Sequence, residues 1–177
     1  MGKARGNMIE QGKQYLVTGA SGFLGRALCR TIVDDGGKVV ALARNEGNLI
    51  KLKQDFEPDQ LYTIPGDIEN KCIVEQAMQD VSGVFHLAAF KHVTIAEEHA
   101  LQCTTTNIHG SINVLEAVKD SSKCKFIITT STDKAAQIKG VYGASKYIVE
   151  KLFQQYQAFD AHTKYRVVRY GNVFWYT

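Results

Sequence analysis

The sequence has few of the residues that mark extracellular, metal-binding or disordered proteins. Its four cysteines include no Cys-x-x-Cys pair and have no histidine at metal-ligand spacing, which argues against zinc and against a disulfide framework. Only two of its residues are proline, and 22% are charged, as in a globular chain. No apolar run approaches the roughly 18 residues of a membrane span, and the start lacks the apolar segment of a signal peptide. We therefore expect a cytoplasmic protein with free thiols and with neither a metal nor a membrane partner.

Length and charge narrow the class further. The 177 residues carry a net charge of +3, and the basic residues are spread along the chain without interleaved aromatics, which argues against nucleic-acid binding. The length suits one domain with a single sizeable core. We expect residues 1–13 to form a flexible lead-in and residues 14–177 to form one domain.

Short apolar runs alternate with helical patterns along the whole domain. Such alternation predicts a doubly wound α/β fold with a parallel sheet of about six strands in the order 3-2-1-4-5-6. One long helix is expected from Ala96 to about Lys119, with Ile108, Ile112, Leu115 and Val118 on its buried side. The expected strands cover residues 15–18, 38–42, 61–64, 83–89, 126–130 and 165–170, and the other helices include 49–56 and 142–159.

A glycine-rich turn joins the first expected strand to the first expected helix. Its sequence is Gly19-Ala-Ser-Gly22-Phe-Leu-Gly25. Glycines at this spacing let the backbone turn tightly and approach a pyrophosphate, which the free N–H groups of the helix N-terminus then bind. Because the strand and the helix are both present, the turn predicts a dinucleotide-binding site.

The residues after the second expected strand indicate which dinucleotide is preferred. An NAD-selecting site places Asp or Glu there, whereas this chain has Arg44, whose guanidinium suits a 2′-phosphate and can stack on adenine. We therefore expect NADP, although a solvated surface arginine would give the same pattern. Asp67 and Ile68 are candidates for the adenine contact, and Asp67 has the alternative role of capping the following helix.

A polar cluster follows the fifth expected strand, where ligands of open α/β sheets bind. It contains Ser131-Thr132-Asp133-Lys134, and Tyr142 and Lys146 follow at helical spacing on one face of the next helix. A cation at ~4 Å favours the phenolate by up to about 4 kcal/mol before desolvation is subtracted. We therefore expect Lys146 to lower the pKa of Tyr142 toward the range of a general base. By its spacing alone, the pair is more typical of an ordinary helix surface, and its position after the strand and the polar cluster is what favours a site.

Together these motifs resemble the extended short-chain dehydrogenases/reductases. More narrowly, the segments 88–93, 106–110, 131–135 and 168–173 resemble the inverting UDP-N-acetylglucosamine 4,6-dehydratases of the polysaccharide-biosynthesis group. The most specific element is Thr132-Asp133-Lys134. The resemblance implies an NADP-dependent nucleotide-sugar dehydratase, and it implies cofactor contacts from Gly19, Ser21, Gly22, Phe23, Leu24, Gly25, Arg44, Asp67, Ile68, Leu87, Ala88, Ala89, Lys91, Asn107, Thr130, Tyr142, Lys146, Tyr170, Asn172 and Val173.

The family's chemistry implies a role for each residue of the polar cluster. Tyr142, assisted by Lys146, takes the proton of the C4 hydroxyl, which Thr132 holds. Lys134 acts as base at C5, and Asp133 acts as acid toward the departing C6 hydroxyl. Without the resemblance, adjacent Asp133 and Lys134 would be read as an exposed ion pair worth under about 1 kcal/mol.

The chain is shorter than members of this group, which implies that the substrate subdomain is largely missing. Two hypotheses follow: a dehydratase, complete or assembled from more than one chain, and a shortened NADP-binding module without turnover. A nucleotide-sugar epimerase is a third. The sixth strand would form an open edge, and such edges find partners, so we expect a homo-oligomer acting on a nucleotide-sugar of the UDP-N-acetylglucosamine class.

Overall fold

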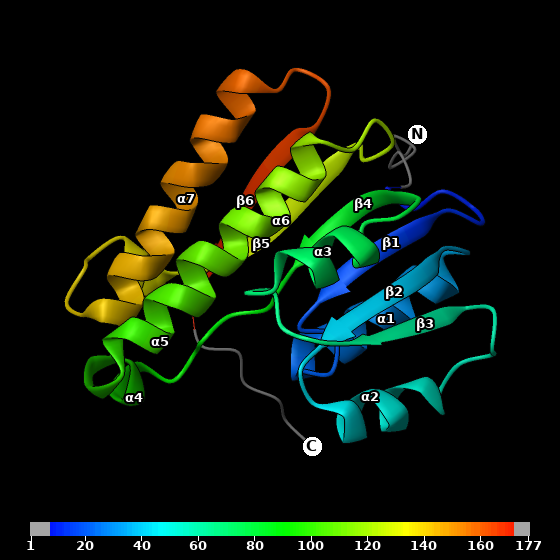
Figure 1. Ribbon diagram of the computed structural model, residues 1–177, viewed down its shortest axis with the longest axis horizontal. Helices are drawn as coiled ribbons and strands as arrows, with labels where there is room; N and C mark the ends of the chain where they lie inside the picture. The colour runs from blue at the N-terminus through cyan, green and yellow to red at the C-terminus, as the bar shows by residue number, and fades with distance from the viewer. Residues whose placement is uncertain (1–7, 172–177) are drawn as a thin grey trace, which may run out of the picture.

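A six-stranded parallel sheet forms the centre of the molecule (Figure 1). The computed structural model describes residues 8–171, so Asn172 and Val173 of the expected cofactor site lie outside the described residues. The strand order is β3-β2-β1-β4-β5-β6, which confirms the predicted topology. The strands are β1 (Gln14–Thr18), β2 (Lys38–Ala43), β3 (Leu61–Pro65), β4 (Val81–His86), β5 (Phe126–Thr132) and β6 (Lys164–Tyr170).

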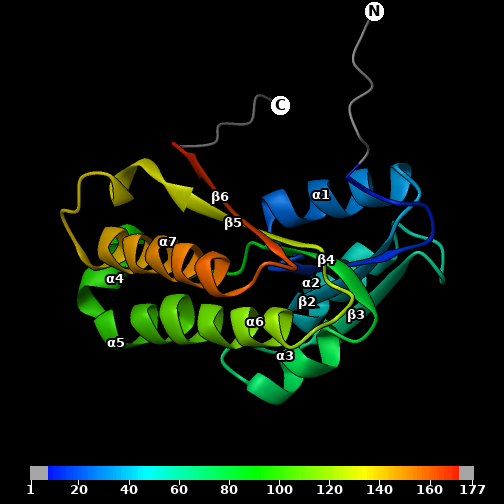
Figure 2. The same ribbon diagram turned by 90° about the horizontal axis from the view of Figure 1, so that it is seen from above.

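Helices cover the two faces of this sheet unequally (Figure 2). On one face, α1 (Phe23–Asp34) and α2 (Glu46–Lys53) pack on β1 to β3 through a core that includes Val17, Ala41 and Leu52. The other face carries α3 (Lys71–Ala77), α6 (Gly110–Lys119) and α7 (Val141–Phe159), whose core includes Leu16, Leu115 and Phe153. Successive residues of β1 therefore point into different cores, as the two-residue period of a strand requires.

The expected helix from Ala96 to Lys119 is wrong as a single helix. The chain forms α4 (Val93–Glu98), leaves helical geometry at His99, and continues as α5 (Ala100–Thr104), the π-helical turn η1 (Thr105–His109) and α6. The packed side of this stretch is partly polar, because Thr106, Asn107 and Ser111 are buried and hydrogen-bonded inside the molecule. The buried stripe of α6 therefore runs through Val114, Leu115 and Val118, while Ile108 and Ile112 are only half-buried.

Helix caps correct two further expectations. The second helix begins at Glu46 rather than Leu49, because the Asn45 side chain accepts a hydrogen bond from the Asn48 N–H at 2.8 Å. Asn70, not Asp67, caps α3 and accepts from the backbone N–H groups of Cys72 and Ile73. The capping alternative for Asp67 is therefore wrong.

The described part of the expected lead-in contacts the domain. Ile9 is buried in the core shared with α1, and Glu10 forms an ion pair of 2.7 Å with Lys125. The Gly12 N–H donates to the Gly36 carbonyl at 2.8 Å. Residues 8–13 thus pack beside the start of β1, at the end of the sheet opposite the polar cluster.

Candidate functional site

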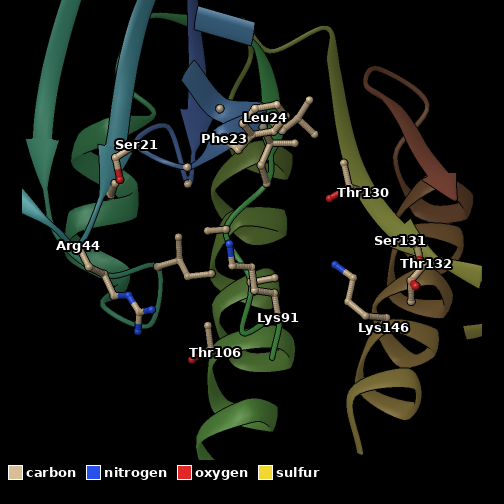
Figure 3. A pocket seen from close by; sticks show the side chains of 18 of the residues that line it. Ser21, Phe23, Leu24, Arg44, Lys91, Thr106, Thr130, Ser131, Thr132 and Lys146 are labelled. Carbon is tan, nitrogen blue, oxygen red and sulfur yellow. The ribbon is translucent and has the colours of Figure 1, made fainter. Parts of the chain in front are cut away.

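A cavity of about 620 Å³ opens where the strands end at their carboxyl termini. Figure 3 shows Arg44 on one side of it, Thr132 and Lys146 on the other, and Lys91 between them. Nearly all described residues of the expected site line this cavity. They are Gly19, Ser21, Gly22, Phe23, Leu24, Gly25, Arg44, Asp67, Ile68, Leu87, Ala88, Ala89, Lys91, Thr130, Thr132, Lys134, Tyr142, Lys146 and Tyr170.

Asn107 and Asp133 are the described members of the expected set that do not line the cavity. The lining includes further residues to which the sequence analysis assigned no catalytic or cofactor contact: Leu42, Ala43, Asn45, Gly66, Val93, Thr106, Ser131 and Gly171. Most of them adjoin a predicted site residue at a strand end, so their sequence position was the available signal. Val93 and Thr106 lie in the segments 88–93 and 106–110, which carry the family resemblance but were given no contact at these two positions.

The glycine turn is packed too tightly to accept side chains. Gly19 has φ +69°, and a Cβ there would lie 2.9 Å from the backbone nitrogen of Ala88. A Cβ on Gly25 would lie 2.4 Å from the carbonyl oxygen of Gly19. Gly22 precedes α1 and offers no side-chain cap. Gly22 and the first turn of α1 line the cavity, and a helix N-terminus at this place suits a phosphate group.

Arg44 and Asp67 stand together at the other end of the glycine turn. The Arg44 guanidinium lies 3.6 Å from Asp67 Oδ2, and its side chain is 61% exposed. Asp67 Oδ1 accepts from the Glu69 N–H at 3.0 Å, which fixes the carboxylate, and Ile68 is buried beside it. The guanidinium therefore keeps donors available to an anionic ligand at this end of the cavity.

A chain of buried hydrogen bonds supports the cavity floor. The Thr18 hydroxyl accepts from the N–H groups of Leu87 and Ala88 at 3.1 Å, so its own proton is donated to His86 Nδ1 at 2.8 Å. The Ser111 hydroxyl donates to the Asn107 carbonyl at 2.5 Å, so His86 Nε2 carries the proton that Ser111 accepts at 3.0 Å. Burial lowers the pKa of His86 to about 3, with a smaller contribution from the charge of Lys146. The imidazole is therefore neutral and holds one tautomer.

Asn107 acts on the cavity through the backbone. Its amide oxygen accepts from the Phe90 N–H at 2.7 Å, and its amide nitrogen donates to the Phe90 carbonyl at 3.2 Å and to Ser145 Oγ at 2.9 Å. Asn107 therefore joins the loop after β4 to α7 and fixes the backbone next to Lys91. The amide nitrogen also donates to Cys103 Sγ at 3.5 Å, so the buried side chain is fully hydrogen-bonded.

Tyr142 and Lys146 both line the cavity, but the expected effect on the pKa of Tyr142 has the wrong sign in this state. Burial raises the pKa of the phenol, and the nearby Tyr170, Cys103 and Asp133 raise it further. Burial lowers the pKa of Lys146 to about 8, against the opposing charge of Glu150. Helical spacing correctly predicts that the two residues share one face of the helix. It does not predict how far burial removes each side chain from water, and burial determines the sign of both pKa changes.

Thr132, Asp133 and Lys134 form a small hydrogen-bonded group at the end of β5. The Thr132 hydroxyl donates to Asp133 Oδ1 at 2.9 Å, and Lys134 Nζ lies 3.4 Å from the same oxygen. The hydrogen bonds from Thr132 and Lys134 hold the pKa of the Asp133 carboxyl below its usual range. Thr132 also caps the 3₁₀ turn η2 (Asp133–Ala135), which sets the direction of both following side chains.

The rest of the described chain offers neither a metal centre nor a membrane span. Among residues 8–171, no group of three His, Cys, Asp or Glu side chains is arranged to hold a metal ion. No helix in that part of the chain is long and apolar enough to cross a membrane. The four cysteines are all free thiols.

Comparison with known proteins gives one family. A family model described as "Polysaccharide biosynthesis protein" matches residues 15–175. UDP-N-acetylglucosamine 4,6-dehydratase (inverting) from Campylobacter jejuni subsp. jejuni serotype O:23/36 is 35% identical over 166 residues, which are 92% of this chain and 49% of that protein. UDP-glucose 4-epimerase from Rickettsia bellii is 33% identical over 91% of this chain and 49% of its own length.

A solved structure agrees with these relatives. The X-ray structure of Pen from Bacillus thuringiensis superposes with a TM-score of 0.86 at 30% identity, covering 92% of this chain and 51% of Pen. The chain therefore spans about half the length of the curated relatives it matches. The resemblance predicted from the motifs is confirmed, and the chain belongs to the polysaccharide biosynthesis protein family.

Proposed function

We propose that this chain is the NADP-binding, chemistry-bearing part of a nucleotide-sugar 4,6-dehydratase of the UDP-N-acetylglucosamine, C5-inverting type. One observation carries the proposal: a single cavity joins Arg44 and the glycine turn to Tyr142, Lys146 and the group of Thr132 and Lys134. The identity to a dehydratase with that name supports the choice of reaction.

The residues present fit a dinucleotide. The glycine turn and the N-terminus of α1 would hold the pyrophosphate, since a Cβ at Gly19 or Gly25 would meet backbone within 3.0 Å. Arg44 would hold a 2′-phosphate beside adenine, with Asp67 and Ile68 on the adjoining wall. When bound, the cofactor would supply the reversible hydride transfer that the reaction needs.

Tyr142 and Lys146 would handle the proton of the sugar's C4 hydroxyl. Because burial raises the pKa of Tyr142, the phenol is neutral before substrate binds, and it needs a positive charge nearby to give a phenolate. Lys146 supplies that charge, since a pKa of about 8 keeps its ammonium mostly protonated at pH 7. Tyr142 then accepts the hydroxyl proton as general base.

The Thr132, Asp133 and Lys134 group would carry out the elimination. Thr132 would turn its hydroxyl to the substrate's C4 oxygen, which removes its hydrogen bond to Asp133 and raises the pKa of that carboxyl toward the range of an acid. Lys134 lines the cavity and lies 3.4 Å from Asp133, so it would pass one of its protons to that carboxylate and become a neutral amine. The amine would then accept the C5 proton, while Asp133 donates the proton it received to the departing C6 hydroxyl. Substrate contact is needed to turn Asp133 toward the cavity, which it does not line.

Two alternatives have support of their own. The identity to UDP-glucose 4-epimerase favours inversion at C4, which needs Tyr142 and Lys146 but no base at C5. A binding module without turnover needs only the dinucleotide end of the cavity, which the glycine turn and Arg44 line. The Asp133 and Lys134 pair argues for the dehydratase over the epimerase.

The decisive experiment incubates the protein with NADP and UDP-N-acetylglucosamine and identifies the product by NMR. A 4-keto, 6-deoxy sugar inverted at C5 supports the proposal, a C4 epimer overturns it in favour of the epimerase, and bound NADP without product leaves the binding module. In an active assembly, Asp133→Asn should still reduce the cofactor, whereas Tyr142→Phe should not. Equal loss of that half-reaction in both variants would contradict the division of roles.

A further inference from the structure

Glu150 continues the line of site residues along α7. Tyr142, Lys146 and Glu150 follow one another at four-residue spacing, so they share one face of the helix. Lys146 is 6% exposed and Glu150 is 5% exposed. Two ionisable side chains at this depth are costly unless their charges are compensated.

The carboxylate of Glu150 is held by the last two strands of the sheet. Its Oε1 accepts from Ser131 Oγ at 2.6 Å and from Arg169 Nε at 2.7 Å, and Arg169 Nη2 donates to Oε2. Ser131 on β5 and Arg169 on β6 are register partners. Glu150 thus spans a strand pair whose next members, Tyr170 and Thr132, line the cavity.

Lys146 is compensated through space rather than by contact. Within residues 8–171, its ammonium makes no ion pair within 4 Å and no hydrogen bond, while its side chain points into the cavity (Figure 3). Burial disfavours its charge, and Glu150 is the largest opposing influence. The charge of Lys146 therefore depends on a carboxylate one turn away that is anchored to β5 and β6.

The other titratable groups around Lys146 do not replace this carboxylate. Burial keeps His86 of β4 and the Cys103 thiol of α5 neutral by lowering the pKa of the first and raising that of the second, and burial likewise keeps Tyr142 neutral. Lys91 and Lys134 line the same cavity and carry like charge. The remaining carboxylates have partners elsewhere: Asp133 with Thr132 and Lys134 on η2, and Glu97 of α4 with the Val141 N–H.

We propose that Glu150 is a positioning residue that keeps the buried Lys146 protonated, and that Arg169 limits this effect by neutralising part of the carboxylate's charge. The inference rests on the proposed function, in which Tyr142 needs a protonated Lys146 beside it to become a phenolate. It predicts opposite signs for the two variants: removing the Glu150 charge makes Lys146 more acidic, and removing the Arg169 charge makes it less acidic.

The test measures the titration of Lys146 directly. NMR of protein with isotope-labelled lysine would follow each ammonium with pH, and the Lys146 signal is the one that disappears in Lys146→Arg. We expect a midpoint of about 8 in the parent protein. Glu150→Gln should move it down, and Arg169→Gln should move it up. Arg166→Gln removes an arginine from the same strand without touching Glu150 and should leave it unchanged.

Either of two results would overturn the proposal. One is an unchanged or higher midpoint in Glu150→Gln, which would mean that the carboxylate only holds the strands together. The other is an unchanged or lower midpoint in Arg169→Gln, which decides the matter even if Glu150→Gln does not fold. The titration needs no cofactor, so failure of every variant and of the parent to bind NADP would reject the proposed function separately.

Discussion

The two halves of the sheet are covered differently. Five of the six residues of β2 are buried, and α1, α2 and α3 cover β1 to β3 from both sides. In β6 only Tyr165 is buried, and within residues 8–171 the face that carries Val168 and Tyr170 is exposed. The dinucleotide end of the cavity therefore rests on strands that are covered on both faces, whereas the chemistry end includes β6, which the described residues cover on one face.

This difference separates the forces that hold each end of the site. Close backbone packing and apolar burial fix the glycine turn, where a single added Cβ at Gly25 would meet backbone at 2.4 Å. At the other end, Glu150, Ser131 and Arg169 hold α7 to β5 and β6 by charge-assisted hydrogen bonds. The geometry of the chemistry end should consequently respond to pH and salt more than that of the phosphate end.

The largest loss of stability should come from a substitution on the face of β6 that α7 covers. Phe153 is 1% exposed and packs edge-on against Tyr165 with ring centroids 6.2 Å apart, so Phe153→Ala should lower the free energy of unfolding by about 3–5 kcal/mol. Val168, on the opposite face, is 49% exposed, and Val168→Ala should cost less than about 0.5 kcal/mol. Urea unfolding of both variants measures the contrast, and equal losses would mean that the two faces are not differently covered.

The glycine turn should give the next largest effect. Gly25→Ala forces its Cβ against backbone, so we expect a loss of about 1–3 kcal/mol in stability together with weaker NADP binding. Gly47→Ala is the matched control, because its Cβ would meet nothing closer than 3.5 Å on an exposed helix. That variant should be neutral or more stable by up to about 1 kcal/mol. Similar behaviour of the two variants would contradict the packing argument.

His86 should make stability fall in mild acid. Its pKa is about 3 in the folded protein and ~6.5 when unfolded, so below pH 6.5 only the unfolded chain gains a proton. Between pH 6.5 and 5, stability should drop by about 2 kcal/mol from this residue. Unfolding measured across that window should show a shallower slope in His86→Gln and an unchanged slope in His162→Gln, at an exposed position. A parent slope equal to that of His86→Gln would refute the assignment.

The smallest effect concerns cofactor choice at the exposed Arg44. Arg44→Ala should weaken NADP binding by about tenfold, or ~1.4 kcal/mol, and should leave NAD affinity nearly unchanged. Arg30→Ala serves as the control, because it removes an arginine of α1 that pairs with Asp55. Calorimetry with both dinucleotides measures the preference. Equal affinities for NADP and NAD in the parent protein would remove the basis for preferring NADP.

Much of the fold could be predicted because it depends on the pattern of apolar residues and glycines within short segments of the sequence. Buried strands of a parallel sheet read as apolar runs, and the glycine turn could be recognised from its flanking strand and helix. The helix after β4 was harder, since burial of Thr106 and Asn107 depends on partners at Phe90, Glu69 and Ser145 that are distant in sequence. Periodicity of apolar residues cannot detect a polar stripe that is satisfied internally.

The sequence predicted which residues form the site, but it did not predict their pKa changes. Spacing brought Tyr142 and Lys146 to one helix face, but the sign of the pKa change at Tyr142 depends on burial, which only the packed structure gives. Glu150 was missed for the same reason, because a glutamate on a helix ordinarily faces water. Its partners, Ser131 and Arg169, come from strands that meet it only in three dimensions.

The position of β1 between β2 and β4 has a consequence for how the chain folds. Strands β1 to β3 and strands β4 to β6 each pair with neighbours in sequence, so within the sheet the two halves are joined by the pairing of β1 with β4, which runs from Gln14 and Val81 to Thr18 and His86. Closing that long loop is the costliest step in chain entropy, and we expect it to form late and to limit the folding rate. Gly19 and Ala88 lie at this junction, so a ligand bound there would bridge both halves and slow their separation.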